Sequence, residues 1–419
     1  MMRLSSSTIF ESNVAGMGQQ QSLMLKTQQQ ISTGRRILTA ADDPAAAAQA
    51  LVVSQSDAAN TQYTSNRNAA QSSLSLAEST LQSVTNLLQA VKTAAVNAGD
   101  GSYSNSDRIS LAKQLSGQLQ DLVGLANSTD GAGNYLFSGF QSRTQPFADT
   151  PAGMSYFGDD GQRNVQISAS RQVASSDSGA DVFMRIKNGN GTFVSQAAAT
   201  NVGAGVISVG TVANPPPALP LDNYSVAFTV AGTPAVTTYT VTDTTTGNDV
   251  ATGLPVPPNP PTVYPYVSGQ TISFAGVQFD IQGAPANGDT FTVTPSANES
   301  IFKTISDLIT TLNTPMASAA NGGGTSLANS LNHALTSLDN ALNNVLTTRS
   351  SLGSRLNEID SLQTMGDSLG LQYKQTLSQL QDVDMTKAIS DLTQQKMGLQ
   401  AAQQSFAAVS TLSLFNYLK

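Results

Sequence analysis

Few residues in this sequence could carry catalytic chemistry. The single histidine is His333 and no cysteine is present, which excludes disulfides, zinc–cysteine sites and thiol nucleophiles. Two pairs of adjacent carboxylates, Asp42–Asp43 and Asp159–Asp160, could combine a general acid with a general base. Asp42–Asp43, however, precedes Pro44 at a predicted helix start, where a carboxylate caps backbone N–H groups. Asp159–Asp160 is followed by Gly161, a pattern that is typical of a turn.

The remaining candidate sites also have structural explanations. His333 lies between the apolar positions Leu331 and Leu335 of a predicted helix, which favours a structural or surface role. The run Gly322–Gly324 lacks the Lys-Ser/Thr that follows the glycines of a phosphate-binding loop, and it is interpreted as a connector. The spacing around Asp159 is incomplete for calcium. We therefore predict that the chain is not an enzyme and has no catalytic residues, no cofactor and no metal site.

The charge balance argues against several classes of partner. The 419 residues include 20 Lys+Arg and 28 Asp+Glu, and 11% of residues are charged, against about 25% in typical proteins. Because no run of basic residues is present, we predict no binding to nucleic acid. No apolar run is long enough for a signal peptide or a membrane span, so we predict no membrane association and no Sec-type secretion. A chain of this length should form two or three domains.

Composition changes twice along the chain. Of the 17 prolines, all but Pro44 and Pro315 lie between Pro146 and Pro295. The flanks are rich in Gln, Ser, Asn, Ala and Leu, which is compatible with long helices. We predict a mainly α fold with an inserted β domain (α+β). Both termini build a long antiparallel helical rod or coiled-coil bundle, and a central β-rich insertion forms a sandwich or a barrel.

Capping residues place the helix boundaries. A weak apolar seam in the first flank ends at Gly34, which suits a left-handed cap. The members of this seam are Phe10, Val14, Met17, Met24 and Ile31, with Gln21 and Gln28 between them. Asp43 and Pro44 then predict the start of a helix that runs to about Ala98.

Two regular seams with spacing 3 and 4 predict a helical bundle. One seam runs from Leu74 to Ala95, and the other runs from Leu331 through Ile359 toward the C-terminus. Ser106–Asp107 predicts the cap of a third helix, and Asp384 predicts the cap of a final helix after a break near residues 383–385.

The middle of the chain alternates in short stretches that predict strands. These stretches are Val165–Ala169, Tyr224–Val230, Ile272–Phe274, Val277–Ile281 and Phe291–Val293. Proline clusters at 215–217 and 255–261 mark loops and leave open whether the insertion forms one piece or two. No Lys or Arg lies between Lys187 and Lys303, so an anionic ligand is not expected there.

These patterns predict five consecutive parts. They are an N-terminal assembly helix (1–43), the first half of the rod (44–139), an outward-facing β-rich insertion (140–299), the second half of the rod (300–383) and a C-terminal assembly helix (384–419). The outer helices have seams diluted by Gln and Ser, with too little apolar area to offset the entropy of ordering a lone hairpin. We expect them to be disordered in the monomer and to fold as copies assemble through Ile31, Leu392, Leu399, Phe406 and Val409.

Two segments near opposite ends resemble the bacterial flagellin family. The first is Ile31-Ser-Thr-Gly-Arg-Arg-Ile37 followed by Ala41-Asp-Asp-Pro-Ala45, with motif positions Gly34, Arg36, Ile37, Asp42, Asp43 and Pro44. The second is Leu380-Gln-Asp-Val-Asp-Met385, with Asp384 as its motif position. Within the family, the stretch 134–147, which contains Tyr135, Phe137 and Gly139, resembles members that join the flagellar hook to the filament.

The resemblance implies a structural subunit of the bacterial flagellum at the hook–filament junction. Such a protein would be extracellular and exported by the flagellar type III apparatus without a cleaved signal peptide. Its implied partners are copies of itself in a ring or layer, another hook-associated protein on the hook side, flagellin on the filament side and a flagellar export chaperone. A flagellin filament subunit is the alternative, and a secreted adhesin or hydrolase with a helical stalk is an alternative of a different class.

Overall fold

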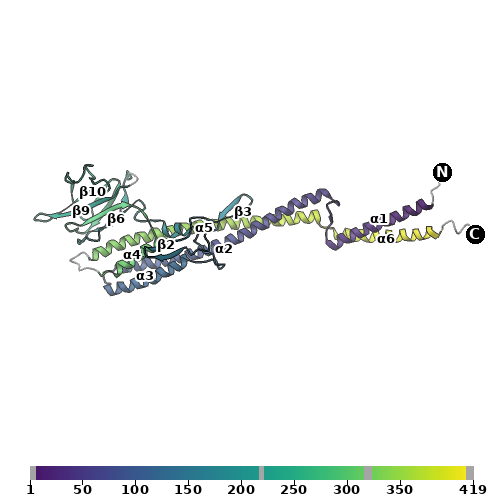
Figure 1. Cartoon of the computed structure of the whole chain (residues 1–419), viewed down its shortest axis with the longest axis horizontal. Helices are drawn as coiled ribbons and strands as arrows, with labels where there is room; N and C mark the ends of the chain where they lie inside the picture. The colour runs from purple at the N-terminus through teal and green to yellow at the C-terminus, as the bar shows by residue number, and fades with distance from the viewer. Residues whose placement is uncertain (1–5, 217–220, 316–322, 412–419) are drawn as a thin grey trace, which may run out of the picture. The chain divides into compact units, whose positions relative to one another are not determined.

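A computed structural model of the chain describes residues 6–216, 221–315 and 323–411. The helices in these ranges are α1 (Ser6–Thr33), α2 (Pro44–Ala98), α3 (Asn105–Ala126), α4 (Ile301–Asn313), α5 (Gly323–Gln381) and α6 (Met385–Thr411). The chain divides into two units (Figure 1). Unit 1 combines the residues up to Asn66 with those from Asp360 onward, and unit 2 is Arg67–Ile359. The long helices α2 and α5 contribute residues to both units, and the five-part division stays a prediction.

Most of the predicted helix boundaries agree with the structure. Helix α2 begins at Pro44 and ends at Ala98, as predicted. Helix α6 begins at Met385, where the backbone N–H of Lys387 donates to Asp384 Oδ1 at 3.1 Å. The cap predicted at Ser106–Asp107 was placed two residues late. The N-cap of α3 is Ser104, whose hydroxyl and backbone N–H form a capping box with Asp107.

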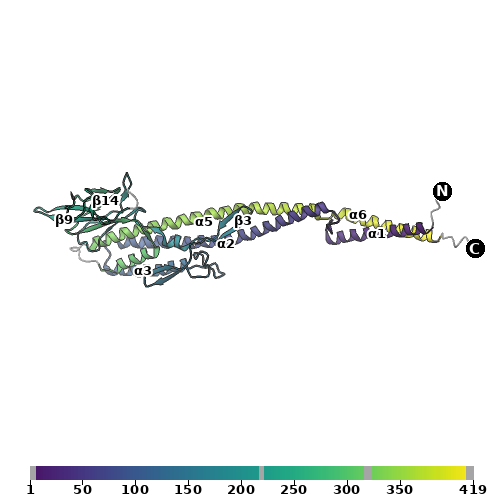
Figure 2. The same ribbon diagram turned by 45° about the horizontal axis from the view of Figure 1, so that its top comes forward.

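The two predicted seams form the core of the helical part of unit 2. The buried members are Leu74, Ala77, Leu81, Val84, Leu88, Val91 and Ala95 in α2, and Leu331, Leu338, Val345, Leu352 and Ile359 in α5. Polar contacts flank this seam, since Arg349 Nη2 lies 2.7 Å from Glu78 Oε1 and Lys92 pairs with Asp339. Helices α2 and α5 lie side by side (Figure 2). Burying each leucine side chain contributes about 1.5–3 kcal/mol to the stability of the folded bundle.

Helix α4 was not predicted as a separate element. Ser300 caps its first turn, because its hydroxyl accepts from the N–H of Lys303 at 3.0 Å. The helix buries an apolar face that consists of Ile301, Phe302, Ile305, Leu308 and Leu312. It packs against α3, whose buried leucines are Leu115 and Leu122.

Two small hairpins and a π-helical turn follow α3. The hairpins are β1 (Phe147–Thr150) with β2 (Gly153–Tyr156), and β3 (Asn164–Ser168) with β4 (Arg171–Ala174). The turn spans Ala180–Met184. Arg355 of α5 holds this region, donating to both carboxylate oxygens of Asp177, at 2.7 and 3.0 Å, and to Ala174 O. The segment is therefore attached to the helical core by ionic as well as apolar contacts.

The described residues of the rest of the insertion, 188–216 and 221–297, form a single sandwich that we call the β module. One sheet has the order β11-β10-β9-β15-β6 with β12 also on β10, where the strands are β6 (Phe193–Ala197), β9 (Tyr224–Ala231), β10 (Val236–Asp243), β11 (Asn248–Asp249), β12 (Val263–Pro265) and β15 (Thr290–Pro295). The second sheet contains β7 (Val206–Ile207), β8 (Thr211–Val212), β13 (Thr271–Phe274) and β14 (Val277–Gln282). The sandwich agrees with the predicted fold class.

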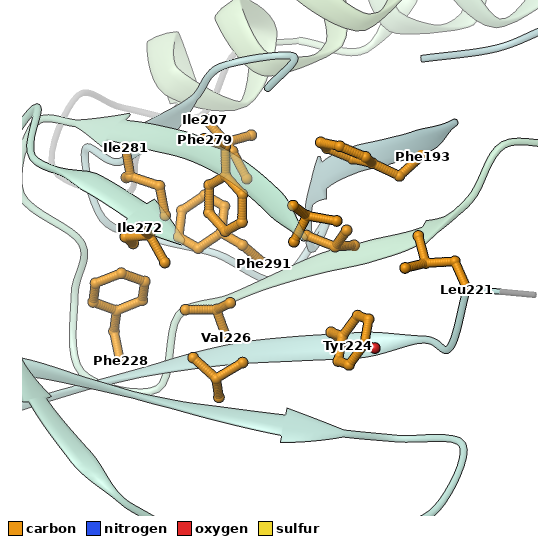
Figure 3. Packing of buried hydrophobic residues seen from close by; sticks show 13 residues of the cluster. Phe193, Ile207, Leu221, Tyr224, Val226, Phe228, Ile272, Phe279, Ile281 and Phe291 are labelled. Atoms are coloured by element: carbon orange, nitrogen blue, oxygen red, sulfur yellow. The ribbon is translucent and has the colours of Figure 1, made fainter. Parts of the chain in front are cut away.

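The proline clusters do not divide the β module. Its buried core joins Phe193 and Ile207, before the first cluster, to Val226 and Phe228 between the clusters and to Phe291 after the second (Figure 3). The described part of the first cluster lies between β8 and β9, and the second lies between β11 and β12. Both are therefore loops within one piece.

The chain enters and leaves the β module at one point. Strands β5 (Ile186–Lys187) and β16 (Asn298–Glu299) pair antiparallel, with Lys187 opposite Asn298. Asn340 of α5 donates to Lys187 O at 2.9 Å and to Gly189 O at 2.8 Å. Asn329 of α5 accepts from the N–H of Ile207 at 3.0 Å. The base of the module is thus hydrogen-bonded to α5.

Candidate assembly surface

The residues of the first flank motif meet the second motif at the bend between α1 and α2. Gly34 ends α1 with a φ of +70°, and the N–H of Val383 donates to its carbonyl at 2.9 Å. The backbone N–H of Arg36 donates to Gln381 O at 2.7 Å, and its guanidinium donates to Leu380 O at 2.8 Å. The sequence predicted these two segments as motifs, and the structure joins them through backbone hydrogen bonds.

Asp42 and Asp43 hold the same bend. Asp42 accepts from the N–H of Thr39 at 2.9 Å and pairs with Lys26 at 2.7 Å. Its pKa is lowered to about 2, mainly by the hydrogen bond from Lys26 and then by that from Thr39. Asp43 accepts from the N–H of Ala46 at 3.0 Å as the predicted cap of α2, and this bond and Arg36 lower its pKa. Both carboxylates are therefore occupied as anions in structural contacts.

The seam between α1 and α6 is more polar than the sequence analysis predicted. Its half-buried and buried positions include Asn13, Met17, Gln20, Met24, Thr27 and Ile31 in α1, and Ala388, Leu392, Gln395, Leu399, Ala402 and Phe406 in α6. The predicted seam members Phe10 and Val14 are instead exposed, although the rings of Phe10 and Phe406 lie 5.1 Å apart. The search for apolar repeats assigned Phe10 and Val14 to the seam and did not include Gln20 and Thr27, because glutamine and threonine are not apolar residues.

Four of the five predicted assembly residues lie in this seam. Ile31, Leu392, Leu399 and Phe406 are half-buried within the hairpin. Val409 belongs to α6, but its side chain lies outside the described residues. Their role in assembly stays a prediction, because contacts within one chain do not test it.

Apolar side chains lie exposed on the outside of the hairpin, where the sequence analysis predicted no surface and assigned Phe10 and Val14 to the seam instead. We call them the outer apolar residues, and they are Phe10, Val14, Leu23, Leu25, Met385, Ile389 and Met397. In the same unit, Leu51 and Val52 of α2 and Met365 and Leu371 of α5 are also exposed. Exposed apolar side chains of this number on one small unit are typical of an interaction surface. A search for one seam per helix placed Phe10 and Val14 in the seam and did not identify the others, because they lie outside it.

The predicted motif residues Tyr135, Phe137 and Gly139 lie in unit 2, not at the hairpin. The Phe137 ring packs edge-on against Phe183, 5.3 Å between centroids. Gly139 has a φ of +69°, and a Cβ there would lie 2.2 Å from Asp159 Oδ1, so only glycine fits. The N–H of Tyr135 donates to Ser142 O at 2.7 Å. This motif shapes the loop that attaches the small hairpins.

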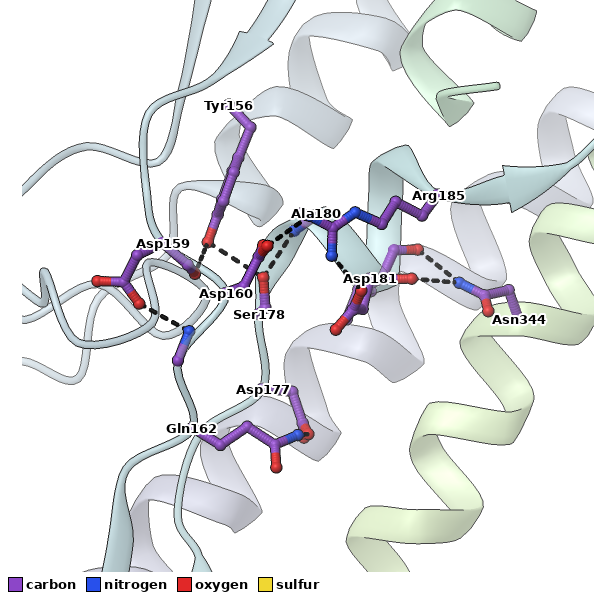
Figure 4. A network of polar contacts seen from close by, with 12 residues as sticks. Tyr156, Asp159, Asp160, Gln162, Asp177, Ser178, Ala180, Asp181, Arg185 and Asn344 are labelled. Carbon is purple, nitrogen blue, oxygen red and sulfur yellow. Dashed lines mark hydrogen bonds and ion pairs between the residues drawn. The ribbon is translucent and has the colours of Figure 1, made fainter. Parts of the chain in front are cut away.

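Asp159 and Asp160 serve the same loop. Asp159 accepts from the N–H groups of Phe140 at 2.9 Å and Gly161 at 2.8 Å, and these bonds lower its pKa against the effect of desolvation. Asp160 pairs with Arg185 at 2.6 Å (Figure 4). The two carboxylates thus have separate structural partners, which agrees with the predicted turn.

The described residues contain no group of three or more His, Cys, Asp or Glu side chains that could hold a metal ion. His333 is half-buried on α5 and lines a cleft with residues of α4, β6 and β7. No helix within the described ranges has the length and apolar character that a membrane crossing requires.

Comparisons with known proteins match both flanks and the whole chain. The bacterial flagellin N-terminal helical region matches residues 5–142, and the C-terminal helical region matches residues 335–418. The flagellar hook-associated protein 3 of Escherichia coli K12 is 29% identical over 418 residues, 100% of each chain. That of Salmonella typhimurium is 39% identical over 185 residues, 44% of this chain and 58% of that protein. The crystal structure of the flagellar junction protein FlgL from Legionella pneumophila is 32% identical, with a TM-score of 0.70, 80% of this chain covered and 100% of that one.

Proposed function

Because this chain belongs to the bacterial flagellin family, among the relatives of hook-associated protein 3, we propose that it is a structural subunit that joins the flagellar hook to the filament. The full-length match to hook-associated protein 3 supports this function over that of a filament-forming flagellin. The relatives are structural flagellar proteins, and the carboxylate pairs of this chain have structural partners, so catalysis is no part of the proposal.

One observation carries the assembly mechanism: the α1–α6 hairpin leaves apolar surface uncovered. Gln20 and Gln395 occupy seam positions, while the outer apolar residues are exposed to water. Covering one large apolar side chain contributes about 1.5–3 kcal/mol. Sister copies that cover the outer apolar residues would therefore favour the ordered hairpin. Helices α1 and α6 would then become ordered as the copies assemble, and this ordering lowers the conformational entropy of the chain.

The partners and the route of export extend the proposal. We propose that copies of the chain form a ring or layer, with another hook-associated protein on the hook side and flagellin on the filament side. A flagellar export chaperone would hold the chain before export, and export would need no cleaved signal peptide. The absence of cysteine in the sequence suits passage as an unfolded chain, since no disulfide has to form or break.

Deletion of the gene in the source bacterium tests the junction function. We expect hooks to form while filament protein is shed into the medium, because the filament has no attachment layer. Re-expression of the natural chain should restore filaments and swimming. A deletion strain that keeps normal filaments would contradict the proposal.

A pair of variants separates the hairpin surface from a general effect of charge. Ile389→Asp places a carboxylate among the outer apolar residues, and Thr229→Asp adds the same charge to an exposed position of the β module. Both monomers should keep the natural far-UV circular dichroism. Ile389→Asp should fail to restore swimming, whereas Thr229→Asp should restore it. Equal swimming of the two strains would argue against the hairpin as the assembly surface.

A polymerisation assay separates the junction function from the flagellin alternative. Purified protein is mixed with sonicated fragments of its own aggregates and observed by electron microscopy. A junction subunit should form at most short oligomers, while a filament subunit should extend the fragments into long filaments. Long filaments would favour the flagellin alternative.

A further inference from the structure

We infer that the β module carries a binding site for a neutral sugar, in a pocket between its two sheets. The pocket has a volume of about 250 Å³, and all of its lining residues belong to strands or loops of the β module. The proposal goes beyond the junction function, because it concerns a ligand of the β module rather than the assembly of the helices. Its test is a binding measurement on purified protein and depends neither on swimming nor on the order of the terminal helices.

The pocket lies between strands β10 and β12 of the first sheet and strand β13 of the second. Its most buried members are the apolar residues Val241 on β10 and Ile272 on β13, each 3% exposed. Figure 3 shows Ile272 among the buried side chains of the core. The lining residues Ala251, Ser273 and Ala275 are exposed, so they form the rim. A ligand can therefore enter from solvent without displacing the core.

Three aromatic side chains form the walls of the pocket. They are Tyr239 on β10, Tyr264 on β12 and Phe274 on β13. The Tyr264 ring stacks on Tyr239, with centroids 5.2 Å apart and an angle of 21° between the planes. Phe274 packs edge-on against Tyr224 at 5.2 Å and against Phe279 at 5.9 Å. Because aromatic faces carry partial negative charge, they attract polarised C–H groups such as those on the face of a sugar ring.

Asp249 holds the loop that completes the pocket. The loop 250–262 contributes Ala251 to the rim and then leads into β12. The carboxylate of Asp249 accepts from the N–H of Ala251 at 3.0 Å and from the N–H of Thr262 at 2.7 Å, so it joins both ends of the loop. Desolvation would raise the pKa of Asp249, but hydrogen bonds from Thr262 and other loop residues outweigh it and lower the pKa. Walls that are fixed before the ligand arrives reduce the entropy lost on binding.

The charges of the β module favour a neutral ligand. No Lys or Arg occurs between Lys187 and Lys303, so the module offers no cation to an anionic ligand. The described lining of the pocket also contains no carboxylate that could pair with a cationic ligand. The volume lies just below the range of about 300–1,000 Å³ that is typical of sites for drug-sized molecules. A neutral ligand of the size of one sugar ring fits these limits.

Two phenol hydroxyls favour a sugar over an apolar side chain of a partner protein. The hydroxyls of Tyr239 and Tyr264 form no hydrogen bond with any residue that the structure describes, and neither is shielded from water. Desolvation raises the pKa of Tyr239, so its hydroxyl stays protonated and can donate as well as accept. An apolar side chain would cover these hydroxyls without pairing them, which is unfavourable. A sugar ring presents C–H groups on its face and hydroxyls at its edge, so it can stack and form hydrogen bonds at once.

Saturation-transfer NMR on the full-length protein tests the proposal. The probes are the methyl glycosides of glucose, galactose, mannose and N-acetylglucosamine, with the anionic sugar N-acetylneuraminic acid as a comparison. At least one neutral glycoside should receive saturation through the protons of its C–H face, and the anionic sugar should not. Added salt should leave the signal unchanged, because screening acts on interactions between charges.

Three variants locate the bound sugar. Tyr264→Ala removes one wall and should weaken binding about tenfold or more, as loss of a stacking ring does for other flat ligands. Ala251→Phe should block the pocket from its exposed rim while all three aromatic walls remain, and it serves if Tyr264→Ala does not fold. Val263→Ala is the control, because Val263 is exposed and neighbouring side chains of a strand point to opposite faces. It should bind as the natural protein does.

Four results would overturn the proposal. The first is the absence of signal from all four neutral glycosides, and the second is binding of the anionic sugar alone. The third is equal binding by the natural protein, Tyr264→Ala and Ala251→Phe, which would place the sugar elsewhere. The fourth is binding of a leucine- or proline-rich peptide in place of the glycosides, which would assign the pocket to an apolar side chain of a partner protein.

Discussion

Replacing Leu81 with Asp should unfold the helical part of unit 2, whereas the same replacement at Leu399 should leave the monomer folded and stop assembly. Leu81 is completely buried in the α2 seam. Truncating such a leucine costs about 2–5 kcal/mol, and a carboxylate without a partner adds several kcal/mol. The sum reaches the range of total stability of a domain, about 5–15 kcal/mol.

At Leu399 the cost to the monomer is smaller. Leu399 is half-buried, so the replacement loses about 1 kcal/mol of apolar transfer, and a carboxylate there can reach water. In an assembled layer the same position would be enclosed by neighbouring copies, and the charge would then lose its water. The effect of Leu399→Asp should therefore appear in assembly rather than in monomer stability.

Two measurements check this contrast. Denaturant titration followed by far-UV circular dichroism should show a large loss of stability for Leu81→Asp and a change of about 1 kcal/mol or less for Leu399→Asp. Swimming assays of complemented deletion strains should show no motility for Leu399→Asp. The reasoning is refuted if Leu81→Asp keeps the natural midpoint, or if the Leu399→Asp strain swims normally.

Three further changes have defined outcomes. Gly139→Ala should destabilise unit 2 by about 2 kcal/mol or more, because a left-handed φ costs about 1–2 kcal/mol for alanine and its Cβ would overlap Asp159; a thermal melt that matches the natural protein would contradict this. Asp42 has a lowered pKa, so its contribution to the bend is present above the ordinary carboxyl pKa of about 3.9 and is lost as the pH falls toward about 2. Exchange protection at the bend should decline over that range in the natural chain, but not in Asp42→Asn. Arg355→Leu should cost about 2–3 kcal/mol, since it leaves a mostly buried carboxylate without its cation, and a denaturant midpoint equal to the natural one would refute it.

Helix boundaries were predictable because capping residues act locally. Asp43 directly precedes Pro44, and Asp384 directly precedes Met385. Each carboxylate accepts a hydrogen bond from an N–H group in the first turn of the helix that begins there. The long seams were predictable for a similar reason, because their leucines repeat without interruption. Gly34 also ends its helix as its missing side chain suggests.

The parts that were missed depend on tertiary context. Strand β10 is rich in threonine and pairs along its whole length with β9, and a search for apolar alternation does not detect such a strand. The α1–α6 seam buries Thr27, whose hydroxyl bonds within its own helix, so polarity gave no sign of burial. The proline clusters suggested a division, but loops of one sandwich contain both of them. Sequence patterns fix neither which loops share a core nor which face of a weak helix turns inward.

Because β5 pairs with β16, the two chain segments that connect the β module to the rest of unit 2 lie next to each other. Lys187 and Asn298 stand opposite each other, so a short turn between them could replace the whole module while the connection stays closed. Such an arrangement lets evolution exchange the module for shorter or longer ones without redesigning the helices beneath it. A foreign domain could likewise be inserted between β5 and β16, in place of the β module.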